Sequence, residues 1–283
     1  MNLPTREFRG LRFSRIGLGC SRIGSLTGAT KEEGLALIER ALEAGITFFD
    51  TASSYGQGDS ERLLSLALSE YEDIIVASKI GKVVPLKARI TKPAKAMIRK
   101  ATRLLPSLSG AIRSSRGAQL PTNFEPPFLE RQLGTSLHRL DLSARPLMML
   151  HSPDVDTLQE GSAIDVLAKA RAAGRVQLIG ASVDDLEAAK AVLADERIDA
   201  IQFPFNSTEP GFADWVREAK SYGKLLVARE IFGGVNVSGQ RTLESIKEDL
   251  KIALSHSAID VVLVGTSRLE HLNQIISCAE GAC

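Results

Sequence analysis

The chain has 283 residues, of which 44% are hydrophobic and 24% charged, and its formal net charge is +1. This composition is typical of a globular protein, and the near-neutral charge gives no general attraction to nucleic acid. No long apolar run and no apolar stretch near the first residues are present, so we expect neither a transmembrane helix nor a secretion signal. Three cysteines without metal or redox spacing, Cys20, Cys278 and Cys283, favour a reduced, cytoplasmic protein without a metal site.

Short apolar segments alternate with amphipathic segments along the chain. The alternation from Arg6 to Phe13 around Gly10 predicts a β-hairpin. Strands are then expected at 16–20, 46–52, 74–80, 146–151, 176–182, 200–205, 225–232 and 261–265. Helices are expected at 34–44, 60–69, 127–140, 157–173, 184–194, 211–222, 243–255 and 269–279. Thr30 and Glu33 form a capping-box pattern before the first of these helices.

The repeated order of one strand and one helix predicts a parallel sheet, because parallel neighbours need a crossover connection. Eight such units are the number that closes into a (β/α)₈ TIM barrel, and we expect residues 1–283 to form this single domain. An open dinucleotide-binding sheet is the competing fold, but Arg22 stands where its fingerprint needs a third glycine. A long basic insertion, residues 82–123, follows the third strand.

Ionisable residues stand where three consecutive strands end. Asp50 ends the second strand, with Tyr55 in the loop beyond it, Lys79 ends the third, and His151 ends the fourth. Catalytic groups of such barrels gather at the carboxyl ends of the strands, and neighbouring strands lie about 4.8 Å apart. We therefore expect these four side chains to form one site.

The types of these residues favour proton transfer to an oxygen. A phenol is a weak acid at neutral pH, and a nearby cation lowers its pKa. Lys79 can be that cation, with Asp50 holding it, while His151 can donate a hydrogen bond to a carbonyl oxygen. The predicted chemistry is carbonyl reduction, with Tyr55 as general acid and a hydride arriving from a cofactor.

Three motifs carry a resemblance to a known family: Asp50-Thr51-Ala52-x-x-Tyr55-Gly56, Ser78-Lys79 and Leu150-His151-Ser152-Pro153-Asp154. The sequence resembles the aldo-keto reductase family over essentially the whole chain except residues 82–123. The resemblance implies an N-terminal hairpin that closes the bottom of the barrel. It also implies a catalytic tetrad of Asp50, Tyr55, Lys79 and His151. The activity implied is NADPH-dependent reduction of an aldehyde or ketone.

The resemblance further implies a cofactor site. By this resemblance the nicotinamide carboxamide is bound by Ser182 and Gln202, and the pyrophosphate by Phe232, Gly233 and Gly234. The adenosine 2′-phosphate is assigned to the segment Gly265, Thr266, Ser267, Arg268 and to His271. Gln274 lies on the adenine side. A helix N-terminus with hydroxyl groups and a guanidinium group suits an anion. From the residues alone, Ser182 could instead be the N-cap of the next helix. The glycines could equally be ordinary turn residues.

Two further classes of function are open. The first is a non-redox barrel enzyme in which Lys79 forms a Schiff base with its substrate. The second is a cofactor-binding regulatory barrel with little turnover. It is motivated by Val183, Gln274 and Ile275, which differ from the amide and carboxylate residues usual in the family.

The insertion is strongly basic. No Asp or Glu occurs between Ile74 and Phe124, whereas ten basic residues lie between Lys82 and Arg116. The segment is either a solvated loop or a lid that recruits an anionic substrate or covers the cofactor phosphates. Without interleaved aromatic residues it does not predict nucleic-acid binding, and we expect no membrane partner. The expected partner is a small carbonyl compound, and the oligomeric state is not predicted.

Overall fold

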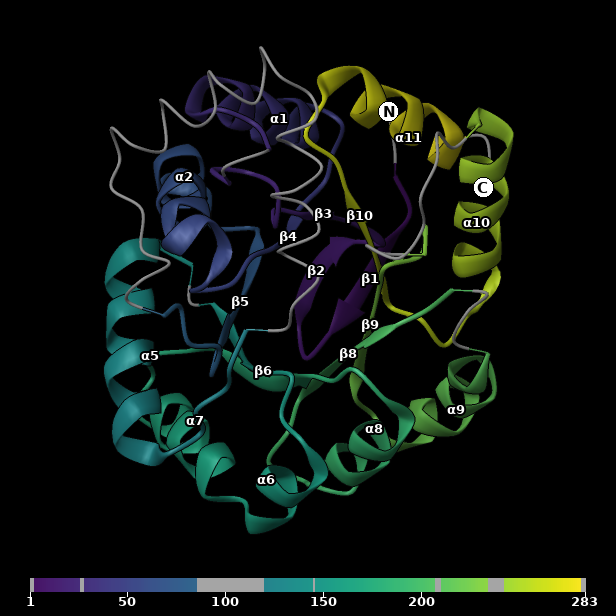
Figure 1. Ribbon diagram of the computed structural model, residues 1–283. Coiled ribbons are helices and arrows are strands. Elements are labelled where there is room, and N and C mark those ends of the chain that lie inside the picture. Colours follow the sequence, from purple (N-terminus) through teal and green to yellow (C-terminus); the bar gives the residue numbers. More distant parts are fainter. Residues whose placement is uncertain are drawn as a thin grey trace.

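The computed structural model describes residues 3–25, 28–85, 120–144, 146–206, 210–233 and 242–280. Eight parallel strands close into a barrel in the order β10-β3-β4-β5-β6-β7-β8-β9, and helices surround it (Figure 1). The predicted (β/α)₈ fold is therefore confirmed. Most of the basic insertion, residues 86–119, lies outside the described residues.

The strands and helices follow the predicted alternation. The barrel strands are β3 (Ile16–Gly19), β4 (Phe48–Asp50), β5 (Ile75–Ile80), β6 (Leu147–His151), β7 (Leu178–Ser182), β8 (Ala200–Pro204), β9 (Leu225–Arg229) and β10 (Val261–Gly265). The helices are α1 (Lys31–Glu43), α2 (Asp59–Leu68), α5 (Pro126–Leu140), α6 (Val155–Glu160), α7 (Ser162–Ala172), α8 (Leu186–Leu193), α9 (Gly211–Ala219), α10 (Leu243–Ser255) and α11 (Leu269–Glu280). Two 3-10 turns are η1 (Tyr55–Gln57) and η3 (Lys220–Tyr222). None of the described helices is long and apolar enough to cross a membrane.

Several predicted bounds differ by a few residues, and two of the differences have local backbone reasons. The single helix expected at 157–173 is two helices, because Gly161 adopts a left-handed φ of 77° that ends α6 and precedes α7. The strand expected to reach Phe232 ends at Arg229, since Glu230 has a φ of 58°, which a strand does not accommodate. The capping box is present: Glu33 donates its N–H to the Thr30 hydroxyl, and the Thr30 N–H is bound by the Glu33 carboxylate.

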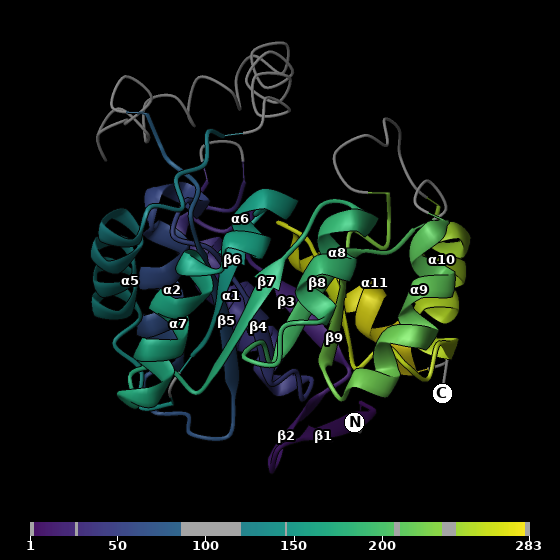
Figure 2. The same cartoon turned by 90° about the horizontal axis from the view of Figure 1, so that it is seen from below.

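The N-terminal hairpin closes one end of the barrel, as predicted. Strands β1 (Thr5–Phe8) and β2 (Leu11–Ser14) pair antiparallel and lie beneath the barrel (Figure 2). Phe13 is buried in the barrel interior, where its ring meets that of Phe48 edge to face with 6.0 Å between the ring centroids. Arg9, in the turn of the hairpin, is ion-paired with Asp199 of the barrel wall. The amino end of the barrel is thus sealed by apolar and ionic contacts, which leaves the carboxyl strand ends for chemistry.

Two apolar layers hold the strands in register. The inner layer fills the barrel with side chains such as Met149, Leu178 and Val227, and the outer layer joins the strands to the surrounding helices. In β5 and β6, Lys79 pairs with Met149 and Ile80 with Leu150. In β4 and β5, Asp50 pairs with Ala77. These registers fix where each polar strand end emerges from the apolar core.

Candidate active site

The four predicted catalytic residues lie together at the carboxyl ends of β4, β5 and β6. Lys79 and Asp50 are buried, and 2.6 Å separates Lys79 Nζ from Asp50 Oδ1. Lys79 Nζ also donates to the backbone oxygen of Thr51 at 2.8 Å. Two oxygen partners fix the ammonium group of Lys79 in one place.

Tyr55 and His151 complete the cluster. Tyr55 lies in η1, and its ring centroid is 5.2 Å from Lys79 Nζ. The rings of Tyr55 and His151 meet edge to face, with 5.9 Å between their centroids and 86° between their planes. The phenol therefore stands between an ammonium group and an imidazole, as proton transfer to a bound oxygen would require.

The loop that carries Tyr55 is held in shape by glycines and backbone bonds. Gly56 and Gly58 have left-handed φ angles of 57° and 86°, which suit glycine best. The N–H of Ser53 donates to the Lys79 carbonyl oxygen at 3.0 Å, which ties the start of the loop to β5. At Gly58 a Cβ would lie 2.4 Å from an Arg139 nitrogen, so a larger residue would have to displace that guanidinium group.

The environment changes the acidity of Tyr55 differently from the prediction. Burial raises the pKa of the Tyr55 phenol above its ordinary value, and Asp50 acts in the same direction. The charge of Lys79 lowers that pKa, as expected, but does not outweigh burial. The prediction of a net lowered pKa is wrong for the protein without ligands, because the depth of Tyr55 in the site was not visible in the sequence.

His151 is neutral at physiological pH. Burial holds its pKa well below the ordinary value, and the positive charges of Lys79, Lys82 and Arg229 act in the same direction. Its Nδ1 atom is buried and has no hydrogen-bond partner among the described residues. A neutral imidazole with an unused nitrogen can bind a ligand oxygen through an N–H group.

Ser182 and Gln202, predicted to bind the cofactor, are joined to the tetrad. Ser182 Oγ donates to Gln202 Oε1 at 2.7 Å, and Gln202 Nε2 donates to Asp50 Oδ1 at 2.7 Å. All three side chains are buried. The N-cap alternative for Ser182 is wrong, because Asp185 caps α8 by accepting the N–H of Ala188.

The other predicted cofactor residues lie at the ends of β9 and β10. Gly233 has a left-handed φ of 82°, Phe232 is partly buried, and Gly234 lies outside the described residues. Gly265 and Arg268 are exposed, and the buried Thr266 hydroxyl accepts the Arg268 N–H at 3.1 Å before α11 begins. Within the described residues, the Arg268 guanidinium has no ion pair. An exposed cation and hydroxyls at a helix start suit a phosphate group.

The remaining predicted cofactor residues lie just before α11 or on it. Ser267 is partly buried just before this helix, and His271 is exposed in its first turn. Gln274 borders a hollow between α10 and α11, together with Leu243 and Asn273. Within the described residues these three side chains make no contact with the tetrad, and they are related to it only by following β10 at the same end of the barrel.

A buried polar network beneath Tyr55 was missed by the sequence analysis. Glu61 of α2 is fully buried and accepts hydrogen bonds from Ser78 and Ser136 and an ion pair from Arg139, with 3.1 Å between Arg139 Nη1 and Glu61 Oε2. Arg139 also donates to the Ser53 carbonyl oxygen at 3.4 Å. The only signal in the sequence was a carboxylate on the apolar side of a helix.

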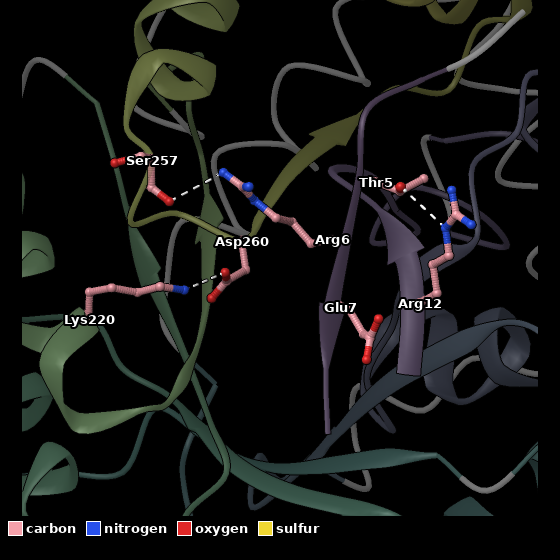
Figure 3. Close-up of a pocket in the computed structure, with 7 residues that line it drawn as sticks. All are labelled: Thr5, Arg6, Glu7, Arg12, Lys220, Ser257 and Asp260. Atoms are coloured by element: carbon pink, nitrogen blue, oxygen red, sulfur yellow. Dashed lines mark hydrogen bonds and ion pairs between the residues drawn. The ribbon is translucent and has the colours of Figure 1, made fainter. Parts of the chain in front are cut away.

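One hollow among the described residues lies away from the tetrad. It has a volume of about 490 Å³ and is bordered by the hairpin and by the loop before β10 (Figure 3). Its polar groups pair with one another: Lys220 Nζ lies 2.6 Å from Asp260 Oδ1, and Arg6 donates to the Ser257 carbonyl oxygen. We assign no chemistry to this hollow, because it lies at the closed end of the barrel.

A parallel eight-stranded barrel with a lysine–carboxylate pair, a phenol and an imidazole at its strand ends defines a class of barrel oxidoreductases. The chain belongs to the aldo/keto reductase family, whose model matches residues 15–251. The aldo-keto reductase YhdN of Bacillus subtilis is 30% identical over 205 residues, which are 71% of this chain and 52% of that protein.

Solved structures show the same fold. The holo form of an aldo-keto reductase from Bacillus halodurans has a TM-score of 0.77 at 18% identity and covers 99% of this chain and 91% of its own. An aldo-keto reductase from Klebsiella pneumoniae, in complex with NADP and acetate, has a TM-score of 0.68 at 16% identity and covers 99% and 90% of the two chains. Among the curated relatives, several alignments span only 29% to 52% of the relative's length.

Proposed function

We propose that the protein reduces an aldehyde or ketone to an alcohol, with NADPH as the hydride donor. The observation that carries the proposal is the position of Tyr55 between the ammonium group of Lys79 and the ring of His151. In this reaction the cofactor supplies a hydride to the carbonyl carbon, and Tyr55 supplies a proton to the carbonyl oxygen. The new C–H and O–H bonds replace the second bond of the carbonyl group and give the alcohol.

The other members of the tetrad have supporting roles. Neutral His151 donates a hydrogen bond to the carbonyl oxygen, which favours the negative charge that develops there. Lys79 favours the phenolate that Tyr55 becomes, because its charge acts against the effect of burial on the pKa of the phenol. Asp50 holds Lys79 in place through the 2.6 Å ion pair.

The cofactor preference rests on the start of α11. The exposed Arg268, with Thr266 and Ser267 beside it, supplies the charge and hydroxyl groups that a 2′-phosphate would need. The Klebsiella pneumoniae relative is in complex with NADP, which supports the same preference. Ser182 and Gln202 would hold the carboxamide, and residues around Gly233 the pyrophosphate.

Binding is tested first, by fluorescence titration with NADPH and with NADH. We expect NADPH to bind more tightly, and Arg268→Met to weaken NADPH binding about tenfold while leaving NADH binding unchanged, since one hydrogen bond to a charged group is lost. Absence of any binding at millimolar NADPH would overturn the proposal. Equal affinity for the two cofactors would overturn only the NADPH preference.

Turnover is tested with Tyr55→Phe against a panel of aldehydes and ketones. Removal of a general acid lowers the rate by roughly 100-fold or more. NADPH binding serves as the control, because the ring of Phe fills the same space. Full activity of Tyr55→Phe would remove Tyr55 from the mechanism, and binding without turnover by the unaltered protein would favour the regulatory barrel.

The Schiff-base alternative has less support from the geometry. The Lys79 ammonium group is ion-paired with Asp50, and a protonated amine is not a nucleophile. Borohydride treatment in the presence of aldehyde should therefore give no adduct on Lys79 in mass spectra. A trapped adduct at that residue would favour the non-redox class.

A further inference from the structure

Lys82 extends from a rigid segment beside the tetrad. Ile80 of β5 pairs with Leu150 of β6, so the chain beyond Ile80 runs past His151. The side-chain amide of Gln132 holds this segment from both sides. It accepts the Gly81 N–H at 2.7 Å and donates to the Lys82 carbonyl oxygen at 2.9 Å. The backbone of Lys82 is therefore fixed.

Lys82 is largely buried as a residue, and its ammonium group has no bonded partner among the described residues. The residue is 7% exposed, and its Nζ makes no hydrogen bond or ion pair with any residue that the structure describes. The positive charge of Lys82 acts on His151, which places the ammonium group within electrostatic reach of the catalytic imidazole. Burial lowers the pKa of Lys82, as expected for a cation without a counter-charge.

The acidic group that acts electrostatically on Lys82 already has a partner. Asp184 acts electrostatically on Lys82, but its Oδ1 lies 2.5 Å from Nη2 of Arg229. Arg229 also donates to the Val183 carbonyl oxygen and is ion-paired with Glu230. These two carboxylates are thus used by Arg229, and Lys82 is a surplus charge in this part of the site.

The other buried lysines in the described parts of the chain behave differently. Lys79 is ion-paired with Asp50, and Lys224 donates to the carbonyl oxygens of Asp195 and Ile198 at 2.8 Å and 2.7 Å. Lys82 has neither kind of partner among the described residues, so its charge is open to a ligand. An unpaired ammonium group on a fixed backbone segment beside a catalytic centre is suited to an anionic group that arrives with a ligand.

We propose that Lys82 binds a carboxylate carried by the carbonyl substrate, so that the protein prefers oxo acids to neutral aldehydes and ketones. This inference rests on the proposed carbonyl reduction. The carboxylate then lies on the His151 side of the site, while the carbonyl oxygen faces Tyr55. A phosphate of the cofactor is the other anion that a lysine here could meet, and the experiment separates the two.

The test uses a matched pair of substrates, 4-carboxybenzaldehyde and its neutral methyl ester, with NADPH. We expect the unaltered protein to have a kcat/KM at least tenfold higher for the acid. Lys82→Met should lower kcat/KM for the acid about tenfold to hundredfold, because one hydrogen bond to a charged group is lost. The value of kcat/KM for the ester should stay the same. Lys82→Arg should retain the preference for the acid.

The control is Lys190→Met, which removes one positive charge from an exposed position on α8. Lys190→Met should change kcat/KM for neither substrate, which separates a general effect of net charge from a local effect of Lys82. Thermal unfolding of each variant confirms that it folds.

Three outcomes overturn the inference, and they differ from failure of the proposed function. An equal loss of kcat/KM for the acid and the ester in Lys82→Met would indicate that Lys82 has a structural role. Weaker NADPH binding in Lys82→Met would assign Lys82 to a cofactor phosphate. Reduction of the ester with no preference for the acid would show that Lys82 does not recognise a substrate carboxylate, while carbonyl reduction itself would be supported. Failure of the proposed function would instead appear as no reduction of either compound.

Discussion

Gln202 donates a hydrogen bond to the same Asp50 oxygen that is ion-paired with Lys79, with distances of 2.7 Å and 2.6 Å. The residue predicted to contact the nicotinamide therefore also determines where the tetrad carboxylate lies. A ligand that binds Gln202 would act on Lys79 through Asp50, because the three polar groups share one oxygen atom.

Removal of the Gln202 amide should loosen this arrangement. We expect Gln202→Leu to lose about 2 kcal/mol of unfolding free energy, since Asp50 loses a buried hydrogen bond and the Ser182 hydroxyl loses its acceptor. Urea unfolding measures the change. Ser182→Ala is the matched control, because it leaves the bond to Asp50 intact and should cost less. A Gln202→Leu protein as stable as the unaltered one would show that the bond to Asp50 contributes nothing.

His151 gives the protein a pH-dependent stability whose sign follows from its environment. The folded protein holds the pKa of His151 well below the ordinary value of about 6.5, so the imidazole stays neutral while the unfolded chain takes up a proton. The resulting stability is complete above about pH 6.5 and is lost as the pH falls toward the folded pKa.

The measurement is urea unfolding between about pH 5 and pH 8, with His151→Gln for comparison. We expect the free energy of unfolding of the unaltered protein to fall more steeply below about pH 6.5 than that of the variant, which lacks the titrating group. Parallel curves for the two proteins would contradict a buried, neutral His151.

Arg139 should support the Tyr55 loop from below. Arg139→Leu removes the ion pair to Glu61, the bond to the Ser53 carbonyl oxygen and the contact at Gly58. Because Arg139 is partly exposed, we expect a loss of about 3 kcal/mol, the lower end of the range for breaking a buried ion pair. Urea unfolding measures it, and Arg139→Lys should recover part of the loss.

The same variant should also affect the chemistry. With Tyr55 as the proposed acid, we expect a loop that holds it less firmly to lower kcat more than it changes KM, because positioning of an acid matters in the transition state. A purely structural role would lower stability and leave kcat of the folded fraction unchanged. Glu61→Gln, with the same shape and no charge, separates the effect of the ion pair from that of the packing.

The barrel and its tetrad could be predicted because both depend on local patterns. Asp50, Lys79 and His151 each follow an apolar run, and parallel strands bring such ends together whatever the helices between them do. The acidity of Tyr55 could not be predicted in the same way. It depends on how much water the surrounding elements exclude, and burial outweighed the charge of Lys79.

Contacts between distant residues were the other part that the sequence did not show. Gln202 and Asp50 are 152 positions apart, and Arg139 and Glu61 are 78 positions apart. In the sequence Glu61 is only a carboxylate on the apolar side of a helix. Its complete burial becomes evident only where α2 and α5 pack together. The predicted helix at 157–173 failed for a local reason, because its glycine was not recognised as left-handed.

The ion pair between Arg9 and Asp199 joins positions that are 190 residues apart. During synthesis the hairpin leaves the ribosome well before its carboxylate partner, which is made 190 residues later. Asp199 also binds Arg171 and the backbone of Ile179, so its surroundings form late as well. The hairpin therefore cannot form this ion pair until the chain around Asp199 has been made, so closure of the barrel floor requires β7 and the segment leading into β8.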